Sequence, residues 1–390
     1  MKRLEEASVQ ELVKSTKPAI RVAWLGHKSV KGGDGITTYS REITNELKKH
    51  GLKVLFFHQY VEGDQETDES IPLPMVQLFH PRMQITTPKA RKELLNTLKN
   101  HLVDIVHVSV AFSTLDFRLP NICHELGIPI VATFHVPFDK RISVWKGITT
   151  AIYRAYATAL ADYDKVIIFT DVQKQMLINM GVPAEKIEII PNGVDIEKYS
   201  PGRGTFKASV EAKSLITYMG RLDPEKNVDA LIRAFKDLNL DDSIKLAIVG
   251  GGSEKKSLEK KFSSDNVIFT GPIADEKSRI DILRSSDIFV LPSSIEGLSL
   301  AMLEAMACGV ATIATDVGGD GEALRGAGIV IEPTELESQL HLALDILLSF
   351  PEFRSQIAAY CRDRVVSQYS LAMNVSKLLD VYIELISGRS

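Results

Sequence analysis

The chain of 390 residues is long enough for two domains of ordinary size, and its hydrophobic content of 45% is typical of a globular protein with a buried core. A formal net charge of −4 excludes a general nucleic-acid binder, whose surface would be basic, so no nucleic-acid partner is expected. Three widely spaced cysteines, Cys123, Cys308 and Cys361, exclude a disulfide framework and a metal knuckle, and they favour a reducing cytoplasm.

The start of the chain and its hydropathy bear on localisation. Residues 1–17 are polar and charged without the apolar core of a secretory signal, and they form either a weak amphipathic helix or a disordered leader. No apolar run approaches the roughly 20 residues that span a bilayer. The sequence therefore predicts a cytoplasmic protein, either free or lying peripherally on the inner face of a membrane.

From Ile20 onward, short strands rich in Val, Ile and Phe alternate with helices. The strands predicted for the first half are Ile20–Gly26, Lys53–His58, Met75–Phe79, Asp104–Val108, Pro129–Phe134, Lys165–Thr170 and Lys186–Ile190. The helices predicted between them are Thr37–His50, Lys89–His101, Ile148–Ala161 and Asp171–Met180. This alternation predicts a doubly wound α/β domain with a parallel sheet and crossover helices.

A turn-rich stretch over 196–214 reads as a junction, and a second set of strands follows it. These strands are Leu215–Met219, Lys245–Val249, Asn266–Thr270, Asp287–Leu291, Val310–Thr315 and Gly328–Ile331. The sequence therefore predicts a second parallel sheet. The chain closes with an amphipathic run over Leu371–Ile386.

Two cations follow the first strand of this second set. Arg221 stands at the carboxyl end of the strand, where open α/β sheets bind ligands, and Lys226 comes five positions later, just before a helix that Asn227 is expected to cap. Fixed cations at a strand end and a helix start suit a diphosphate. The alternative is a pair of exposed salt bridges to Asp223 and Glu225, which contribute little.

A second motif, Glu296 to Glu304, follows the strand Asp287–Leu291. Its helix is expected to begin near Ser299 and to end at Gly309, so the amides of Gly297, Leu298 and Ser299 are candidates to hold an anion. Glu296 and Glu304 would repel a phosphate but accept hydrogen bonds from hydroxyls. Cations for phosphate beside carboxylates for hydroxyls predict a nucleotide-sugar site.

The first half offers two further candidate ligand contacts. Gly33 and Asp34 lie in a glycine-rich loop between the first strand and a helix, which is either a structural turn or a loop that approaches a ligand. His135 ends the strand Pro129–Phe134, so it either projects toward a ligand or is a satisfied core histidine.

Metal-binding alternatives are weak. The histidines at predicted strand ends, His27, His58, His80 and His107, lack the pairing of a metal site. Asp162 and Asp164 form an Asp-x-Asp, but they precede a strand at its amino end, and a polar turn is the better interpretation. The sequence therefore predicts no metal and no cofactor.

Basic and aromatic residues interleave with apolar ones over 139–156, including Lys140, Arg141 and Trp145. Two interpretations stay open: an interfacial helix that meets a membrane, or an ordinary helix packed in the first domain. The first would place these residues on the acceptor side and would make the acceptor a lipid.

The Arg-x4-Lys pair, the Glu-x7-Glu motif and Pro191-Asn192-Gly193-Val194-Asp195 occur in an order that resembles the retaining glycosyltransferases of family 4. The resemblance implies the GT-B fold, in which two Rossmann-like domains face a cleft and the C-terminal helix returns to the first domain. The expected domains are 1–196 with 371–390 on the acceptor side, and 197–370 for the donor.

The resemblance also implies a hexosyltransferase that uses a nucleotide diphosphate sugar, with UDP favoured, and needs no metal. Arg221 and Lys226 would hold the diphosphate, Glu296 the sugar hydroxyls and Glu304 the ribose. His135 and the Gly33 loop would contact the transferred sugar.

The acceptor stays open between a membrane glycolipid, a polysaccharide and a small molecule. Rival functions are an epimerase or phosphorylase on the same fold, and a catalytically silent nucleotide-sugar-binding protein.

Overall fold

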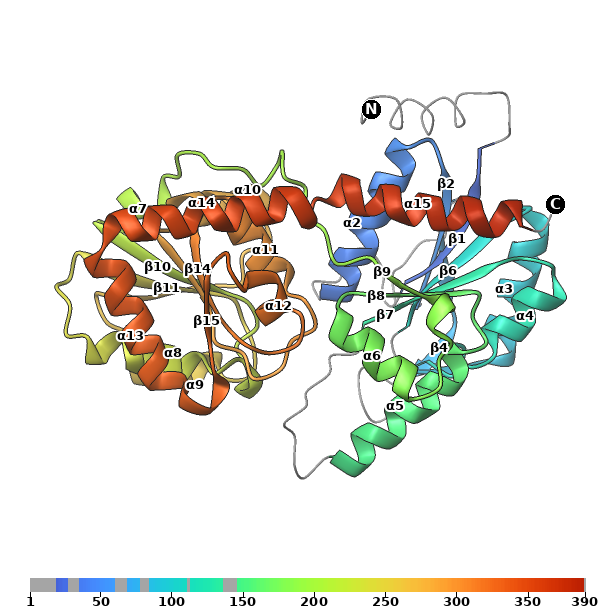
Figure 1. Cartoon of the computed structure of the whole chain (residues 1–390), viewed down its shortest axis with the longest axis horizontal. Helices are drawn as coiled ribbons and strands as arrows, with labels where there is room; N and C mark the ends of the chain where they lie inside the picture. The colour runs from blue at the N-terminus through green and yellow to red at the C-terminus, as the bar shows by residue number, and fades with distance from the viewer. Residues whose placement is uncertain are drawn as a thin grey trace. The chain divides into compact units, whose positions relative to one another are not determined.

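Two parallel β-sheets, one in each of two structural units, organise the chain (Figure 1). The computed structural model describes residues 19–26, 35–59, 69–77, 84–110, 113–135 and 146–388, and the side chains of 146–152 lie outside this description. Unit 1 contains the described residues up to Ile190 together with the chain from Val375 onward. Unit 2 contains Pro191–Asn374.

Unit 1 is built on a seven-stranded parallel sheet with the order β3-β2-β1-β6-β7-β8-β9. Its strands are β1 Arg21–Leu25, β2 Lys53–Gln59, β3 Ser70–Leu73, β6 Ile105–Val110, β7 Ile130–Phe134, β8 Lys165–Ile168 and β9 Ile187–Ile189. Every residue of β6 and β7 is buried, as expected for central strands covered on both faces.

One predicted strand of unit 1 is placed differently from expectation. The segment 75–79 was expected within the parallel alternation, but β4 Met75–Gln77 pairs only with β5 Gln84–Thr86, and the pairing is antiparallel. The edge of the main sheet is taken instead by β3, which the sequence did not predict. Pro72 lies within β3, which suits an edge strand, where a missing N–H costs least.

The helices of unit 1 are α2 Gly35–Lys49, α3 Pro88–Asn100, α4 Leu119–Glu125, α5 Lys146–Leu160 and α6 Asp171–Asn179, with a 3₁₀ turn η1 at Ala184–Lys186. The last helix of the chain, α15 Leu371–Ser387, joins them, because its residues from Val375 onward belong to unit 1 (red in Figure 1). The Tyr382 hydroxyl on α15 lies 2.6 Å from Nδ1 of His107 in β6. The predicted return of the C-terminal helix to the first domain is confirmed.

Unit 2 is built on a six-stranded parallel sheet with the order β12-β11-β10-β13-β14-β15. Its strands are β10 Ser214–Met219, β11 Ile244–Val249, β12 Val267–Gly271, β13 Ile288–Leu291, β14 Ala311–Thr315 and β15 Ile329–Ile331. The chain runs outward from β10 to β12 and then returns to the other side of β10 with β13. This reversal of direction makes the β10–β13 boundary a topological switch point.

The helices of unit 2 are α7 Phe206–Ser209, α8 Val228–Asp237, α9 Lys255–Phe262, α10 Glu276–Ser285, α11 Leu300–Ala307, α12 Asp320–Leu324, α13 Leu336–Ser349 and α14 Pro351–Gln368. Two 3₁₀ turns, η2 Pro224–Lys226 and η3 Pro333–Glu335, accompany them. The expected amphipathic face of α8 is buried at Val228, Leu231, Ile232 and Phe235. Two doubly wound parallel sheets confirm the predicted α/β class.

All three cysteines are buried, and none of them forms a disulfide. Burial raises the pKa of the Cys308 thiol to about 12 and that of Cys361 to about 11. Their thiols are therefore protonated and shielded at neutral pH.

Candidate functional site

Four loops of unit 2 leave the sheet at the same edge. The strands β11, β10, β13 and β14 are neighbours and parallel, so the loops that follow them gather at their carboxyl ends. The residues 250–254 follow β11, 220–227 follow β10, 292–299 follow β13, and 316–319 follow β14. The predicted donor residues therefore lie beside the switch point, where ligands bind in such sheets.

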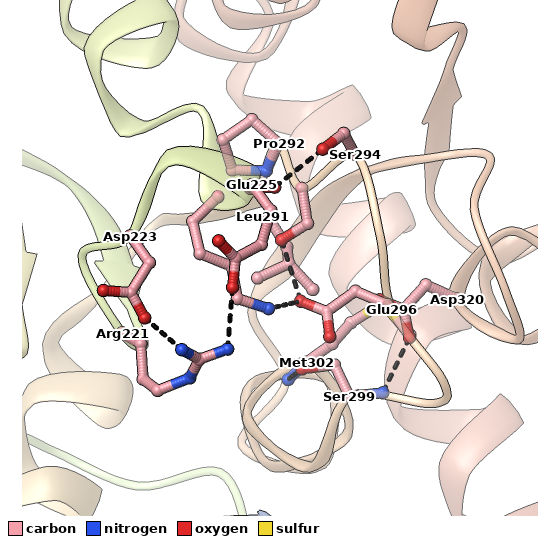
Figure 2. Close-up of polar contacts among 12 residues, drawn as sticks. Arg221, Asp223, Glu225, Leu291, Pro292, Ser294, Glu296, Ser299, Met302 and Asp320 are labelled. Atoms are coloured by element: carbon pink, nitrogen blue, oxygen red, sulfur yellow. Dashed lines mark hydrogen bonds and ion pairs between the residues drawn. The ribbon is translucent and has the colours of Figure 1, made fainter. Parts of the chain in front are cut away.

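Arg221 leaves β10 and turns toward its own loop (Figure 2). Its guanidinium donates to the carboxylates of Asp223 and Glu225, the latter at 2.9 Å. The Arg221 side chain is 49% exposed, so these pairs add little stability, but they hold the guanidinium in one place. The salt bridges considered from sequence are thus present, and they hold the Arg221 guanidinium at the edge of the candidate site.

Asp223 is itself fixed from a neighbouring loop. The amide and hydroxyl of Ser253, in the loop after β11, donate to its Oδ1 at 3.0 and 2.9 Å. These bonds, led by the backbone one and aided by Arg221 and Lys226, hold the pKa of the Asp223 carboxyl below its usual value. Asp223 therefore stays ionised at neutral pH.

Lys226 and Glu296 form an ion pair across the switch point. The Lys226 ammonium lies 2.5 Å from Oε1 of Glu296, and the Ser293 hydroxyl donates to the same oxygen at 2.8 Å. The two charged side chains are only 10% and 15% exposed. The structure thus brings together three of the predicted site residues, Arg221, Lys226 and Glu296, within two adjoining loops.

Backbone bonds join the two loops. Ser294 donates its amide to the Glu225 carbonyl at 2.8 Å, and the Asn227 side chain donates to the Pro292 carbonyl at 3.0 Å. Asn227 occupies the N-cap position of α8 as expected, but its backbone dihedrals are left-handed and its side chain makes no capping hydrogen bond to the helix. Its side chain instead connects the β10 and β13 loops.

The start of α11 departs in part from expectation. Ser299 caps the helix as expected, since its hydroxyl accepts from the amide of Met302 at 3.3 Å. Its own amide, predicted to be open to an anion, donates to Oδ1 of Asp320 at 2.7 Å. The carboxylate of Asp320, at the start of α12, therefore occupies this amide, and of the three candidate amides those of Gly297 and Leu298 remain.

Main-chain carbonyls in the loop before α11 also accept hydrogen bonds. Gly297 accepts from the amide of Gly319, and Leu298 accepts from the side-chain amide of Asn192 at 2.7 Å. Asn192 belongs to the motif 191–195, and the sequence analysis missed its contact with the loop after β13. The motif itself was the signal that could have found it.

Glu304 lies on α11, one to two turns beyond Ser299. Its electrostatic neighbours are Tyr199, Arg279 and Cys308. Burial, followed by the charges of Glu304 and Glu276, raises the pKa of the Tyr199 phenol. The two glutamates of the motif therefore have different surroundings.

His135 follows β7 in unit 1, as predicted. Its ring lies edge-on to Tyr39, with centroids 4.7 Å apart, and near Phe169 at 5.3 Å. Two aromatic side chains thus lie beside the imidazole at the carboxyl edge of this sheet.

The other histidines considered from sequence are structural where they are described. His107 lies within β6 rather than at its end, fully buried and bonded to Tyr382 and Thr133. Burial, then the charge of His135, lowers the pKa of His107 well below its usual value. His58 is buried in β2 and bonds Ser70, while His27 and His80 lie outside the described residues.

The Asp-x-Asp segment is a structural turn, as interpreted. Asp164 accepts the amide of Ile130 at 2.8 Å, and the buried Tyr163 donates its hydroxyl to the Asp116 carbonyl. Within the described ranges, no three His, Cys, Asp or Glu side chains gather closely enough to hold a metal ion.

Several predicted site residues lie outside the described part of the chain: Gly33, Asp34, Lys140, Arg141 and Trp145. Farther along the same basic and aromatic segment, Tyr153 and Tyr156 are buried against Phe134, with ring centroids 5.9 Å apart in each case. This end of α5 packs as an ordinary helix. None of the described helices is long and apolar enough to cross a bilayer.

Comparison with known proteins assigns the family. The model of Glycosyltransferase Family 4 matches residues 33–198, and the model of Glycosyl transferases group 1 matches residues 205–364. The chain is 28% identical over 326 residues to the UDP-Gal:alpha-D-GlcNAc-diphosphoundecaprenol alpha-1,3-galactosyltransferase of Escherichia coli, which covers 77% of this chain and 80% of that protein.

Another relative and a solved structure agree. The alpha-monoglucosyldiacylglycerol synthase of Streptococcus pneumoniae is 26% identical over 307 residues, covering 72% of this chain and 67% of that protein. The structure of sucrose-phosphate synthase from Thermosynechococcus elongatus superposes with a TM-score of 0.75 at 19% identity, covering 95% of this chain and all of that one. The chain belongs to the GT-B glycosyltransferases, with a family 4 domain in its first half and a group 1 domain in its second.

Proposed function

We propose that this glycosyltransferase moves a hexose from a nucleotide diphosphate sugar, with UDP as the favoured carrier, to an acceptor hydroxyl, with retention of configuration and without a metal ion. The observation that carries the proposal is the cluster of Arg221, Lys226 and Glu296 in two adjoining loops at the carboxyl edge of the unit 2 sheet. The UDP carrier is supported by the name of the Escherichia coli relative.

Arg221 and Lys226 bind the diphosphate in this proposal. Both cations are held by carboxylates of their own chain, so the donor's phosphate oxygens replace Asp223, Glu225 or Glu296 as partners. As the bond to the sugar breaks, negative charge grows on the leaving diphosphate. Cations already in position stabilise that charge in the transition state, which is the role a metal ion plays elsewhere.

In this proposal, Glu296 accepts hydrogen bonds from the hydroxyls of the sugar, and Glu304 accepts them from the hydroxyls of the ribose. A carboxylate released by Lys226 accepts hydrogen bonds from hydroxyls, and Ser293 keeps the Glu296 carboxylate oriented. The different surroundings of the two glutamates support contacts with different parts of one extended ligand. Of the amides before α11, those of Gly297 and Leu298 are proposed to face the donor.

The transfer step forms a bond between the acceptor oxygen and the anomeric carbon while the bond from that carbon to the phosphate oxygen breaks. UDP leaves with the bonding electron pair, and the acceptor proton passes to the leaving phosphate. This front-face course needs no carboxylate nucleophile. His135 and the Gly33 loop, with Asp34 on the acceptor side, are proposed to contact the transferred sugar, which would exclude water from it.

The proposed acceptor is a lipid at a membrane surface. Both relatives carry lipid names, diphosphoundecaprenol in one and diacylglycerol in the other. Lys140, Arg141 and Trp145 belong to a segment whose basic and aromatic residues suit an anionic lipid surface. The enzyme would then act as a peripheral protein on the inner face of the membrane.

The test begins with donor binding. A thermal-shift screen of UDP-glucose, UDP-galactose and other nucleotide sugars should give stabilisation of about 2.7 kcal/mol at a hundredfold excess over Kd. Lys226→Met should abolish this shift. Lys207→Met is the matched control, since Lys207 pairs with Asp287 at 2.6 Å at the opposite, amino edge of the sheet. Equal shifts in both variants would refute the proposed donor site.

Transfer assays with and without lipid vesicles then separate the remaining functions. Product formation only with vesicles, unchanged by a chelator, supports a metal-independent lipid glycosyltransferase. A donor epimer formed without acceptor identifies an epimerase, and donor binding without turnover identifies a silent protein. A trapped covalent sugar–protein adduct would overturn the front-face course.

A further inference from the structure

Asp320, the first residue of α12, places a buried carboxyl group against the start of α11. Only 1% of its surface is exposed, and its Oδ1 accepts the amide of Ser299 at 2.7 Å (Figure 2). Its Oδ2 is buried and has no hydrogen-bond partner in the described part of the chain. A carboxylate thus occupies the amide that, at a helix N-terminus, would otherwise attract an anionic ligand.

The charges around Asp320 do not cancel it. It interacts electrostatically with Lys226 and Glu296, but the Lys226 ammonium already lies 2.5 Å from Glu296. Burial raises the pKa of Asp320, so it adds a second negative group beside Glu296 only at a pH above that raised value. A phosphate that binds Lys226 would then come close to a negative charge that the Ser299 amide holds in place.

A negative charge at Asp320 repels the substrate and the product to different extents. The diphosphate of a nucleotide sugar carries two negative charges, because both phosphates are esterified. After transfer the terminal phosphate is free, and with a second pKa near 6 it gains about one more charge at pH 8. A fixed negative charge repels the product more than the substrate, since Coulomb energy is proportional to charge.

We infer that Asp320 makes the donor site discriminate against the nucleoside diphosphate product and so promotes its release. The inference rests on the proposed function, because it requires a diphosphate at Lys226. It goes beyond that function by giving a role to a residue that contacts the amide of Ser299 rather than the reacting atoms. Asp320 is therefore a specificity-determining residue and not a catalytic one.

A purely structural role predicts something different. If Asp320 only caps the Ser299 amide, an asparagine at this position serves as well, since its side-chain oxygen accepts the same bond. Asp320→Asn therefore removes the charge and keeps the cap. The variant separates the two explanations without relying on a loss of folding.

The matched control is Asp287→Asn. Asp287 also accepts a backbone amide, that of Leu215 at 2.8 Å, and also faces a lysine, Lys207 at 2.6 Å. It precedes β13 and so lies at the amino edge of the same sheet, away from the proposed donor loops. It matches the chemistry of Asp320 at a place where no donor is proposed.

The experiment measures Kd for UDP and for the UDP-hexose that the donor screen identifies, by calorimetry at pH 8.5. In Asp320→Asn, we expect UDP to bind about tenfold more tightly and the UDP-hexose only about fivefold more tightly, so that product inhibition rises. Asp287→Asn should leave both constants unchanged. An unchanged ratio of the two constants in Asp320→Asn would overturn the inference.

Repeating the titration at lower pH gives an independent check. Burial and the charge of Glu296 raise the pKa of Asp320, against the Ser299 amide and Lys226, while the nearby Tyr369 phenol has its pKa raised to about 12 and stays neutral. Protonation of Asp320 should therefore make the wild type approach Asp320→Asn as the pH falls. A difference that stays constant with pH contradicts the inference, whereas a wild type that binds no UDP-hexose contradicts the proposed function.

Discussion

The side-chain amide of Asn192 donates a hydrogen bond of 2.7 Å to the main-chain carbonyl of Leu298. Asn192 stands at the second residue of unit 2, and Leu298 lies in the loop between β13 and α11. The Asn374 side chain donates in turn to the Pro191 carbonyl at 2.9 Å, so both chain ends of unit 2 meet at this point. The loop proposed to hold the donor is thereby anchored to the residues where the chain enters and leaves the unit.

Breaking this anchor should weaken donor binding. Asn192→Asp keeps the size of the side chain but places an acceptor against the Leu298 carbonyl, which leaves two buried acceptors facing each other. We expect about tenfold weaker UDP-hexose binding in calorimetric titrations, from a penalty of about 1.4 kcal/mol. Asn374→Asp is the control, because it disturbs the carbonyls of Pro191 and Asn192 while the side-chain bond from Asn192 to Leu298 remains. Equal affinities in Asn192→Asp and wild type would contradict the prediction.

The Lys226–Glu296 pair should show strong coupling. Lys226→Met leaves a half-buried carboxylate with only the Ser293 hydroxyl, and Glu296→Gln leaves an uncompensated ammonium. Each single change should destabilise unit 2, by about 2 to 3 kcal/mol for Lys226→Met. The double variant buries no unpaired charge, so its loss should be clearly smaller than the sum of the two, as measured by denaturant unfolding. Additive losses would mean that the two side chains do not act as a pair.

The stability of the folded chain should depend on pH through the Asp223 carboxyl group. Its folded-state pKa is lowered from the usual 3.8, so its contribution is present above that value and is lost as the pH falls through the lowered folded-state value. We expect Asp223→Asn to melt at a lower temperature than wild type at pH 7, and the two melting temperatures to converge as the pH falls below 3.8. Thermal unfolding across this range checks the prediction, and parallel curves would refute it.

His107 should produce a second pH dependence, in unit 1. Its folded-state pKa is lowered well below 6.5, so below pH 6.5 the unfolded chain binds a proton that the folded chain does not. Stability of unit 1 should therefore fall between pH 7 and pH 5, and His107→Gln should flatten this dependence.

The fluorescence of Trp24 offers the readout, because its ring stacks on His107 with centroids 4.1 Å apart. The measurement uses a Trp145→Phe background, since the chain has two tryptophans. A wild-type unfolding free energy that does not change over this pH range would contradict the prediction.

The sequence predicted the sheet architecture well where strands are long and apolar. Predicted strands such as Leu215–Met219 and Lys245–Val249 match β10 and β11 to within one residue, because a continuous apolar run between turn residues has few other interpretations. It missed β3 and α4, which are four and seven residues long and contain proline, so neither shows a clear period.

Neighbouring parallel strands place the residues that follow them at one edge of the sheet. This rule allowed the sequence to predict that Arg221, Lys226 and Glu296 lie close together, as they do in the structure. The partners of the α11 amide and of the Leu298 carbonyl did not follow from any local pattern. Asp320 lies 21 positions beyond Ser299, and Asn192 lies 106 positions before Leu298. Such contacts depend on how α12 and residues 191–195 pack against the loop after β13 and the start of α11, which local sequence patterns do not encode.

The burial of Cys123, Cys308 and Cys361 has a practical consequence for spectroscopy. Since none of these thiols presents a nucleophile to solvent, a single cysteine introduced at an exposed position would be the one group that a maleimide dye modifies rapidly. With one such cysteine in each unit, a fluorophore pair could be attached to an otherwise native chain, and energy transfer would measure the distance between the two labelled positions.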